Sequence, residues 1–339
     1  MRATKSATET TQPNTTIRTK RIGRRLLGIL MLTAGIVWML QIMETPVKEA
    51  AQQVMELRDR LFMSTNNRAL AENQIQAQAA LVMDAATGKT LFYKNDQERM
   101  PPASTTKIMT ALLALENADP KERVLVGKEV LWTESDESRA GLQPGELMTW
   151  RELITAMMLP SGNDAARTIA VQIGMKHADA GISREEAYQV FVEMMNERAA
   201  SLGMRDTQYR NPHGMHDKGH YTTANDLSKL ARAAMKNSLF REIVEEKQAN
   251  LDVSYEDHKD EKTVVNRNQL LQPNSDYYYE GAIGIKTGFT DQAGYCLVAS
   301  ADRGGQEVIA VVLHSGMNEV WTDSHALLDY GFKELGLEL

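Results

Sequence analysis

The sequence predicts a mixed α/β (α+β) fold: a mainly antiparallel sheet flanked by helices, with a helical subdomain. Two groups of strand-like apolar runs predict the sheet, one within residues 79–93 and the other within 282–314. The residues between these groups show mostly helical periodicity. Two amino-terminal and three carboxy-terminal strands would form one sheet, and the helices would cover its faces.

Length and charge narrow the classes of function. The chain has 339 residues, enough for one large domain or two ordinary ones. Its formal net charge is −7, although seven Lys and Arg residues against one Glu give residues 1–25 a net charge of +6. The remainder therefore carries about −13. Because nucleic acid phosphates attract basic surfaces, this acidic body argues against a nucleic acid partner.

An uncharged run at residues 26–43 follows the basic segment. As a helix of 18 residues it would be about 27 Å long, close to the hydrocarbon thickness of a bilayer. Arg24 and Arg25 precede it, so the positive-inside rule places residues 1–25 in the cytoplasm. We predict a basic cytoplasmic tail at 1–25, an uncleaved transmembrane signal anchor at 26–43, and an extracytoplasmic remainder. A cleaved signal peptide and a buried core helix are the alternatives.

The polar, helix-prone residues 44–77 lack a strong apolar stripe and are predicted to form a juxtamembrane stalk. A single folded domain would then span residues 78–339. It is expected to open with a hairpin, whose strands cover residues 79–84 and 90–93 around a turn at 86–89.

Helices are expected in the middle of the chain. Ser183 and Glu186 form a capping box for a helix that reaches Leu202, and Gly203 ends it. The other helices are expected to begin at Ser104 and to span 151–159, 165–173 and 223–235, with short strands or coil at 120–150.

The carboxy-terminal part returns to strands. Residues 241–280 are charged and are predicted to be irregular. The remaining elements are three strands at 282–287, 294–300 and 307–314 and a closing helix at 323–335. Cys296, the only cysteine, lies in one of these apolar runs and is expected to be a small buried core residue.

Ser104 and Lys107 stand three residues apart at the start of a predicted helix, after Pro101 and Pro102. Residues i and i+3 share a helix face, so the hydroxyl and the amine can meet. A serine is a weak nucleophile until a nearby base takes its proton. A lysine held among apolar side chains loses part of its preference for the charge and can act as that base.

Two further motifs fit acyl transfer. Ser161-Gly162-Asn163 occupies a turn between two predicted helices and offers a hydroxyl that can relay a proton and an amide that can bind. Lys286-Thr287-Gly288 ends a predicted strand and offers a cation and a hydroxyl for a substrate carboxylate, with a glycine that permits close approach. The helix that begins at Ser104 adds amino-terminal amides that can hold an oxyanion. The three motifs in this order predict a serine enzyme.

Ser-x-x-Lys, Ser-Asp-Asn and Lys-Thr-Gly in this order are the signature of class A β-lactamases and penicillin-binding proteins. This chain departs from that signature at the middle motif, where it has Ser-Gly-Asn. With Ser-Gly-Asn as the middle motif, the chain resembles the low-molecular-mass penicillin-binding proteins, which are serine-type D-alanyl-D-alanine carboxypeptidases. The resemblance runs from about Ala79 to Phe332. Besides the three motifs, it rests on the segments 102–104, 159–166, 211–214, 220–224 and 284–288.

The resemblance implies a β-lactamase/penicillin-binding-protein-like fold and a peptidase of peptidoglycan biosynthesis. It would remove the terminal D-alanine from stem pentapeptides through an acyl-enzyme, with β-lactams as inhibitors and no cofactor or metal. Ser104 would be acylated, Lys107 would be the general base, and Ser161 would pass the proton to the leaving D-alanine. The substrate would be bound by Asn163, Lys286, Thr287, Gly288 and Phe289, with the amides of Ser104 and Phe289 forming the oxyanion hole.

Three rival interpretations remain open at this point. A β-lactamase would need a Glu-x-x-x-Asn loop, and Glu246 with Asn250 matches that spelling, although within a charged stretch. A non-catalytic penicillin-binding sensor or scaffold is the second rival. His213, His216 and His220 suggest a zinc peptidase, but they lie in a loop without a glutamate placed as base, and the plainer interpretation is that they hold the loop.

Many members of the resembled family carry an all-β domain after the catalytic one, often with a membrane-binding tail. This chain ends at Leu339, directly after the closing helix, so the amino-terminal anchor is expected to replace that tethering role.

Overall fold

The computed structural model describes residues 74–134, 136–178 and 180–337, which belong to one compact unit, Asn67–Leu339. The predicted basic tail, the predicted signal anchor and most of the predicted stalk lie outside the described residues. Within those residues, no helix combines the length and the apolar character that crossing a membrane requires.

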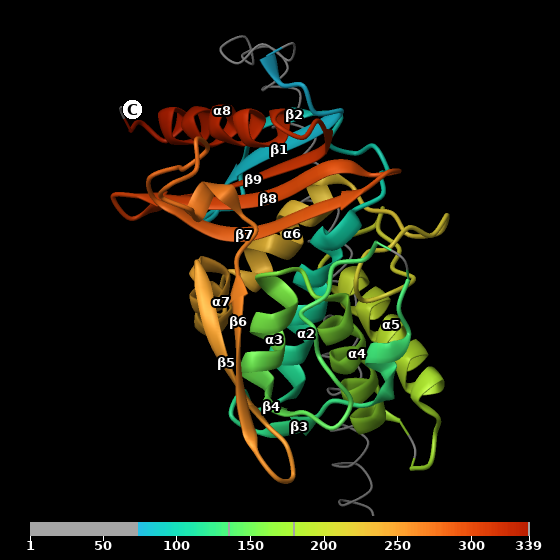
Figure 1. The fold of residues 1–339 in the computed structure, drawn as a ribbon. Helices are drawn as coiled ribbons and strands as arrows, with labels where there is room; N and C mark the ends of the chain where they lie inside the picture. The colour runs from blue at the N-terminus through green and yellow to red at the C-terminus, as the bar shows by residue number, and fades with distance from the viewer. Residues whose placement is uncertain (1–73, 135, 179, 338–339) are drawn as a thin grey trace, which may run out of the picture. The chain divides into compact units, whose positions relative to one another are not determined.

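Five antiparallel strands form the main sheet, in the spatial order β2-β1-β9-β8-β7 (Figure 1). The strands are β1 (Ala79–Asp84), β2 (Thr90–Lys94), β7 (Ala282–Thr290), β8 (Gly294–Arg303) and β9 (Gln306–Ser315). The prediction that two early and three late strands share one antiparallel sheet is confirmed. β7 is the last strand in this order and pairs with β8 alone, so it lies at an edge of the sheet.

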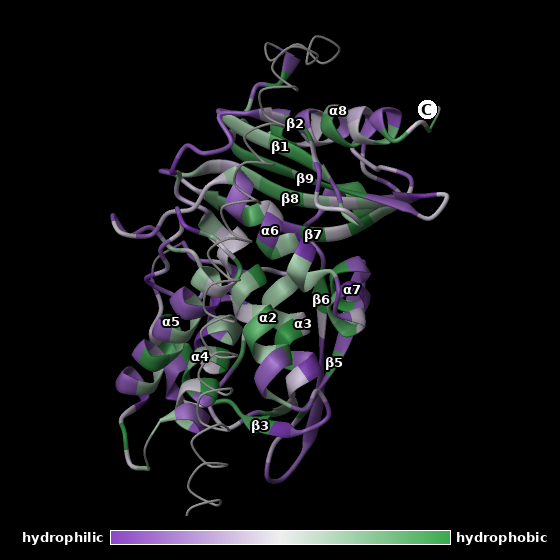
Figure 2. Cartoon of the chain, turned by 180° about the vertical axis from the view of Figure 1, so that it is seen from behind, coloured by the Kyte–Doolittle hydropathy of each residue, from purple (hydrophilic) through white to green (hydrophobic). Residues whose placement is uncertain are grey.

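Both faces of the sheet are buried. Alternate residues of a strand point to opposite faces, so Leu81 packs in the core with α6 (Ala224–Ala234) and Val82 packs in the core with α8 (Glu319–Glu334). Figure 1 shows the two helices on either side of the sheet, and Figure 2 shows the sheet as a largely hydrophobic layer. Because both sides are buried, the sequences of these strands are continuous apolar runs.

The helical part of the domain packs on the α6 side of the sheet (Figure 1). Its helices are α2 (Lys107–Asn117), α3 (Trp150–Met158), α4 (Asn163–His177) and α5 (Arg184–Ser201). The capping box predicted at Ser183 is confirmed, and Gly203 follows the end of α5 with a positive φ of 70°. The helix predicted to begin at residue 165 begins at Asn163, which places that side chain in its first turn.

The prediction that residues 241–280 are irregular is wrong. The segment contains the end of α7 (Ser238–Glu245), the strands β5 (Gln248–Ser254) and β6 (Lys259–Val265), and a 3₁₀ turn, Gln269–Leu271. The strands β5 and β6 join β3 (Arg123–Leu125) and β4 (Leu147–Thr149) in a second sheet of order β3-β4-β5-β6. Five of the seven residues of β6 are exposed and four are charged, so no apolar run marks this strand in the sequence.

The folded domain extends to residues that precede the predicted boundary at 78. Ile75 and Ala77 are buried in the core beneath α8. The carboxylate of Asp323 accepts hydrogen bonds from the amides of Gln76 and Ala77, both at 2.8 Å. Cys296 is buried in the core as predicted, and burial raises the pKa of its thiol to about 12.

Candidate active site

The predicted nucleophile lies where the chain turns into α2. Residues Ala103–Thr106 form a 3₁₀ turn, and the α-helix begins only at Lys107. Ala103 has a positive φ of 48°, which turns the chain immediately before Ser104. The predicted meeting of the two side chains is observed: Lys107 Nζ lies 2.9 Å from Ser104 Oγ. The Lys107 side chain is fully buried, whereas Ser104 is half-buried.

The amine of Lys107 also donates to Asn163 Oδ1 at 2.6 Å and to the carbonyl oxygen of His213 at 2.8 Å. Both oxygens can only accept, so they take the two N–H groups of a neutral amine and leave its lone pair directed at Ser104. Burial lowers the pKa of Lys107 well below its usual value, and the positive charge of Lys286 lowers it further. The geometry and the pKa therefore both suit a base that takes the serine proton.

The segment before α4 places Asn163 at this amine. Ser161 is buried and has a positive φ of 67°, and Gly162 is the residue that caps α4. A Cβ on Gly162 would lie 2.6 Å from the carbonyl oxygen of Ala156, so only glycine fits here. Within the described part of the chain, the Ser161 hydroxyl is not among the hydrogen-bond partners of Lys107.

The third predicted motif runs along the edge strand β7. Lys286 is buried, and burial together with the charge of Arg267 lowers its pKa to about 7. A Cβ on Gly288 would lie 3.0 Å from the backbone nitrogen of Ser104, so the strand passes directly against the nucleophile. Thr287 is half-buried, and the exposed ring of Phe289 packs on Tyr295 with centroids 4.5 Å apart.

The loop that contains His213 completes the surroundings of Lys107. Its contribution is a backbone carbonyl, which side-chain chemistry in the sequence does not reveal. The loop passes close to the nucleophile, since a Cβ on Gly214 would lie 1.8 Å from the carbonyl oxygen of Ala103. Gly214 has a positive φ of 89°, and its amide donates to Asn211 Oδ1 at 2.6 Å. The segment 211–214 could be recognised from its motif, but its function could not.

The ring nitrogens of His213 and His220 are engaged within the protein. His213 Nδ1 accepts from the Met215 amide at 3.2 Å, and its Nε2 lies 3.3 Å from Tyr188 Oη. His220 Nε2 lies 2.9 Å from Thr106 Oγ1. Burial lowers the pKa of His213 well below its usual value and that of His220 to about 4. His216 is exposed, and no three His, Cys, Asp or Glu residues cluster as a metal site among the described residues.

The residues that suggested a β-lactamase loop have other surroundings. Glu246 follows α7 and forms an ion pair with Arg151 at 2.7 Å. Asn250 lies on β5, where Thr263 of β6 donates to its side chain at 3.0 Å. Neither side chain is a partner of Ser104 or Lys107 in the described part of the chain.

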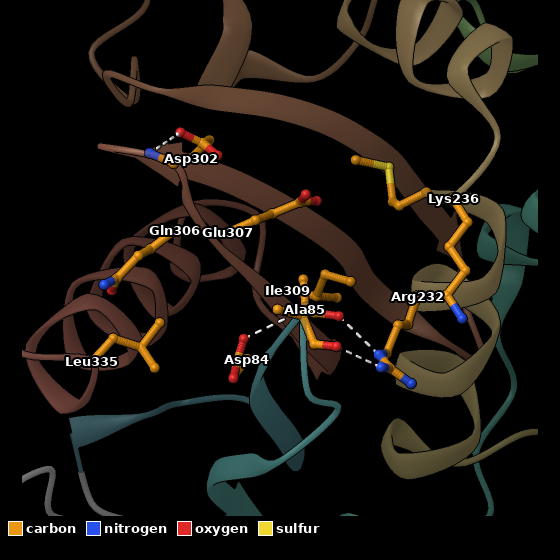
Figure 3. A pocket seen from close by; sticks show the side chains of 12 residues that line it. Asp84, Ala85, Arg232, Lys236, Asp302, Gln306, Glu307, Ile309 and Leu335 are labelled. Carbon is orange, nitrogen blue, oxygen red and sulfur yellow. Dashed lines mark hydrogen bonds between the residues drawn. The ribbon is translucent and has the colours of Figure 1, made fainter.

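A cavity of about 420 Å³ lies elsewhere, beside α6 and the ends of β1 and β9 (Figure 3). The guanidinium of Arg232 points into it but donates to the carbonyl oxygens of Ala85 and Ala86 at 2.8 and 2.7 Å. None of the predicted site residues lines it. This cavity is therefore separate from the candidate site at Ser104.

Comparisons with known proteins point to one family. A family model described as D-alanyl-D-alanine carboxypeptidase matches residues 64–316. The chain is 34% identical over 283 residues to the D-alanyl-D-alanine carboxypeptidase DacF of Bacillus subtilis. The matched region covers 80% of this chain and 66% of that protein. It is 34% identical over 276 residues to a D-alanyl-D-alanine carboxypeptidase of a Streptomyces species, covering 79% of this chain and 91% of that protein.

Solved structures show the same fold. A Streptomyces DD-transpeptidase superposes with a TM-score of 0.71 at 35% identity, over 76% of this chain and 98% of that one. A penicillin-binding protein homolog from Mycobacterium tuberculosis superposes with a TM-score of 0.66 at 32% identity, over 76% and 92% of the two chains. The predicted penicillin-binding-protein-like fold is confirmed. Together with the family model, these relatives show that this chain belongs to the D-alanyl-D-alanine carboxypeptidase family.

Proposed function

We propose that this chain is a serine-type D-alanyl-D-alanine carboxypeptidase that removes the terminal D-alanine from peptidoglycan stem pentapeptides and is acylated by β-lactams. The observation that carries the proposal is the buried Lys107 amine, which two carbonyl oxygens hold 2.9 Å from Ser104 Oγ. Family membership supplies the substrate class, and the site supplies a mechanism.

Ser104 Oγ attacks the carbonyl carbon between the two D-alanines, and Lys107 takes the hydroxyl proton. Collapse of the tetrahedral intermediate breaks the C–N bond and leaves an ester on Ser104. The proton passes from Lys107 to the leaving amine, with Ser161 as the relay. Water then adds to the ester, the C–O bond to Ser104 breaks, a proton of the water passes to Ser104 Oγ, and the shortened peptide leaves as a carboxylic acid.

The edge strand β7 is the place for the end of the substrate. Lys286 and Thr287 bind the terminal carboxylate, and Asn163 binds a backbone amide. Gly288 lets the peptide lie close to Ser104, where the amides of Ser104 and Phe289 receive the developing oxyanion. An edge strand offers unpaired backbone groups to an extended peptide, which suits this mode of binding.

A second candidate outcome is transfer of the acyl group to an amine instead of water, because one solved relative is a DD-transpeptidase. Both outcomes share the acyl-enzyme on Ser104. Analysis of the products from a purified pentapeptide separates them. We expect loss of one D-alanine in buffer, and a new, longer peptide in the presence of an amine acceptor would show transfer. Rapid hydrolysis of penicillin with no release of D-alanine from the peptide would instead support a β-lactamase. Stable acylation by penicillin with no cleavage of the peptide would support a non-catalytic penicillin-binding sensor.

We also propose that the uncharged run 26–43 anchors the chain in a bacterial membrane with the catalytic domain outside. The support is the length of the run and the basic segment before it. Deletion of residues 1–43 is expected to leave the protein active and to move it from the membrane fraction to the soluble fraction. A truncated chain that stays with the membrane, or that loses activity, would contradict the anchor.

A further inference from the structure

Two buried charges adjoin the active site that the mechanism above does not use. Arg167 donates two hydrogen bonds to Glu137, at 2.8 and 2.6 Å. Their side chains are only 3% and 1% exposed. A buried ion pair is on balance no more stabilising than apolar packing, because both charges lose their hydration. Stability alone therefore does not account for this pair beside Lys107.

The pair is connected to Lys107 through one side chain. Asn163 Nδ2 donates to Glu137 Oε2 at 3.1 Å, while Asn163 Oδ1 accepts from Lys107 at 2.6 Å. A carboxylate can only accept, so it takes the NH₂ group of the amide and forces the amide oxygen toward the amine. Asn163 and Arg167 stand four residues apart on α4 and so share one face of the helix.

We propose that Glu137 and Arg167 are a positioning pair, which fixes the side-chain amide of Asn163 so that its oxygen holds the Lys107 amine toward Ser104. The inference rests on the proposed role of Lys107 as the base. Glu137 orients the amide, and Arg167 orients Glu137. With the amide turned around, its NH₂ group would face the amine, and the lone pair of Lys107 would no longer be reserved for Ser104.

The loop that carries Glu137 is fastened to the same helix, so the pair acts within a rigid frame. The carbonyl oxygen of Ser138 accepts from the amide of Asn163 at 2.8 Å. The buried carboxylate of Asp164 accepts from the backbone amides of Ala140, Gly141 and Leu142 at 2.8 to 3.0 Å. A fixed loop holds Glu137 at one distance from Asn163, as a positioning residue requires.

The pair also makes opposing electrostatic contributions at Lys107. The groups that face the amine are Arg167 and Asp164 from α4, Glu137 from the loop, Lys286 from β7 and the neutral imidazole of His213. Burial is the main cause that lowers the pKa of Lys107; Arg167 lowers it further, and Glu137 raises it. Loss of Arg167 alone therefore raises this pKa, loss of Glu137 alone lowers it, and loss of both raises it less than loss of Arg167 alone. For Glu137 itself, burial opposes the charge, but the hydrogen bonds from Arg167 and Asn163 prevail and lower its pKa.

The test is the pH dependence of acylation by a fluorescent penicillin in the full chain. In the wild type, the rate rises with pH as Lys107 loses its proton. We expect Arg167→Gln to move this rise to higher pH by about one unit, which is about a tenfold loss of rate at a fixed pH on the rise. Arg167→Lys keeps the charge and should leave the rise near its wild-type position.

Two further variants keep the test decisive where a single change unfolds the protein. Glu137→Gln with Arg167→Gln removes both charges and should move the rise in rate back toward its wild-type pH. The rate itself should stay lower, because a glutamine at 137 accepts either orientation of the Asn163 amide. Arg184→Gln is the matched control. It breaks the ion pair with the buried Glu129, at 2.7 Å, which joins α5 to the segment before the loop. Arg184→Gln should lower the unfolding midpoint but leave the pH at which the acylation rate rises unchanged.

The outcomes separate this inference from the proposed function. If the wild type is not acylated at all, the proposed function fails. If the wild type is acylated but Arg167→Gln lowers only the unfolding midpoint, as Arg184→Gln does, the pair is merely structural and the inference fails.

Discussion

Replacement of Lys107 by methionine is expected to lower the rate of acylation by penicillin by about 10³-fold, the range of a lost general base. Methionine has nearly the shape of the lysine stem but no amine to take the proton of Ser104. Stopped-flow or gel-based measurement of acylation with a labelled penicillin gives the rate. The same variant should lose release of D-alanine from a pentapeptide to the same extent, because both reactions begin with the same attack.

The matched control is Lys176→Met, at a lysine of α4 that pairs with Glu122 on the surface. This change should leave the rate of acylation at the wild-type value. Unfolding midpoints of both variants show whether the fold is retained. A folded Lys107→Met protein that is acylated at the wild-type rate would remove the lysine from the mechanism.

The efficiency kcat/KM for a pentapeptide is expected to fall as the pH rises through about 7, because the pKa of Lys286 in the free enzyme is about 7. The charged form binds the substrate carboxylate, and it is lost as the pH rises above this pKa. A bound carboxylate favours the charged lysine, so the corresponding fall in kcat should occur at higher pH. Lys286→Gln should lower kcat/KM by about 10²-fold, as expected for the loss of a charged hydrogen bond in a buried site.

A peptide whose terminal carboxylate is replaced by a carboxamide provides the control. It has no negative charge for Lys286, so its kcat/KM should be low and should not fall near neutral pH. An alkaline fall of equal size with both peptides would assign the titration to another group and would contradict the role of Lys286 as the carboxylate clamp.

The parts of the site and of the fold that the sequence could predict are those that depend on residues close together in the sequence. Ser104 and Lys107 share one helical turn, so their contact follows from spacing alone. The capping box at Ser183 and the glycine after α5 are equally local. The sheet could be predicted because strands buried on both faces are continuously apolar.

The remainder depends on contacts between distant segments. The carbonyl oxygen of His213 reaches Lys107 across 106 positions of sequence, and a backbone carbonyl leaves no signal in the residue type. Glu137 and Arg167 look like ordinary surface charges until the loop folds against α4. The strand β6 was missed for a related reason: its side chains are mostly exposed, so its pairing with β5 leaves no apolar pattern.

Peptide mass spectrometry after brief exposure to penicillin tests the central claim, that Ser104 is the acylated nucleophile, most directly. We predict one addition of the intact penicillin mass, located on the peptide that contains Ser104 and absent from a folded Ser104→Ala variant. An adduct on a different residue, or the release of hydrolysed penicillin from a Ser104→Ala variant at the wild-type rate, would contradict the claim.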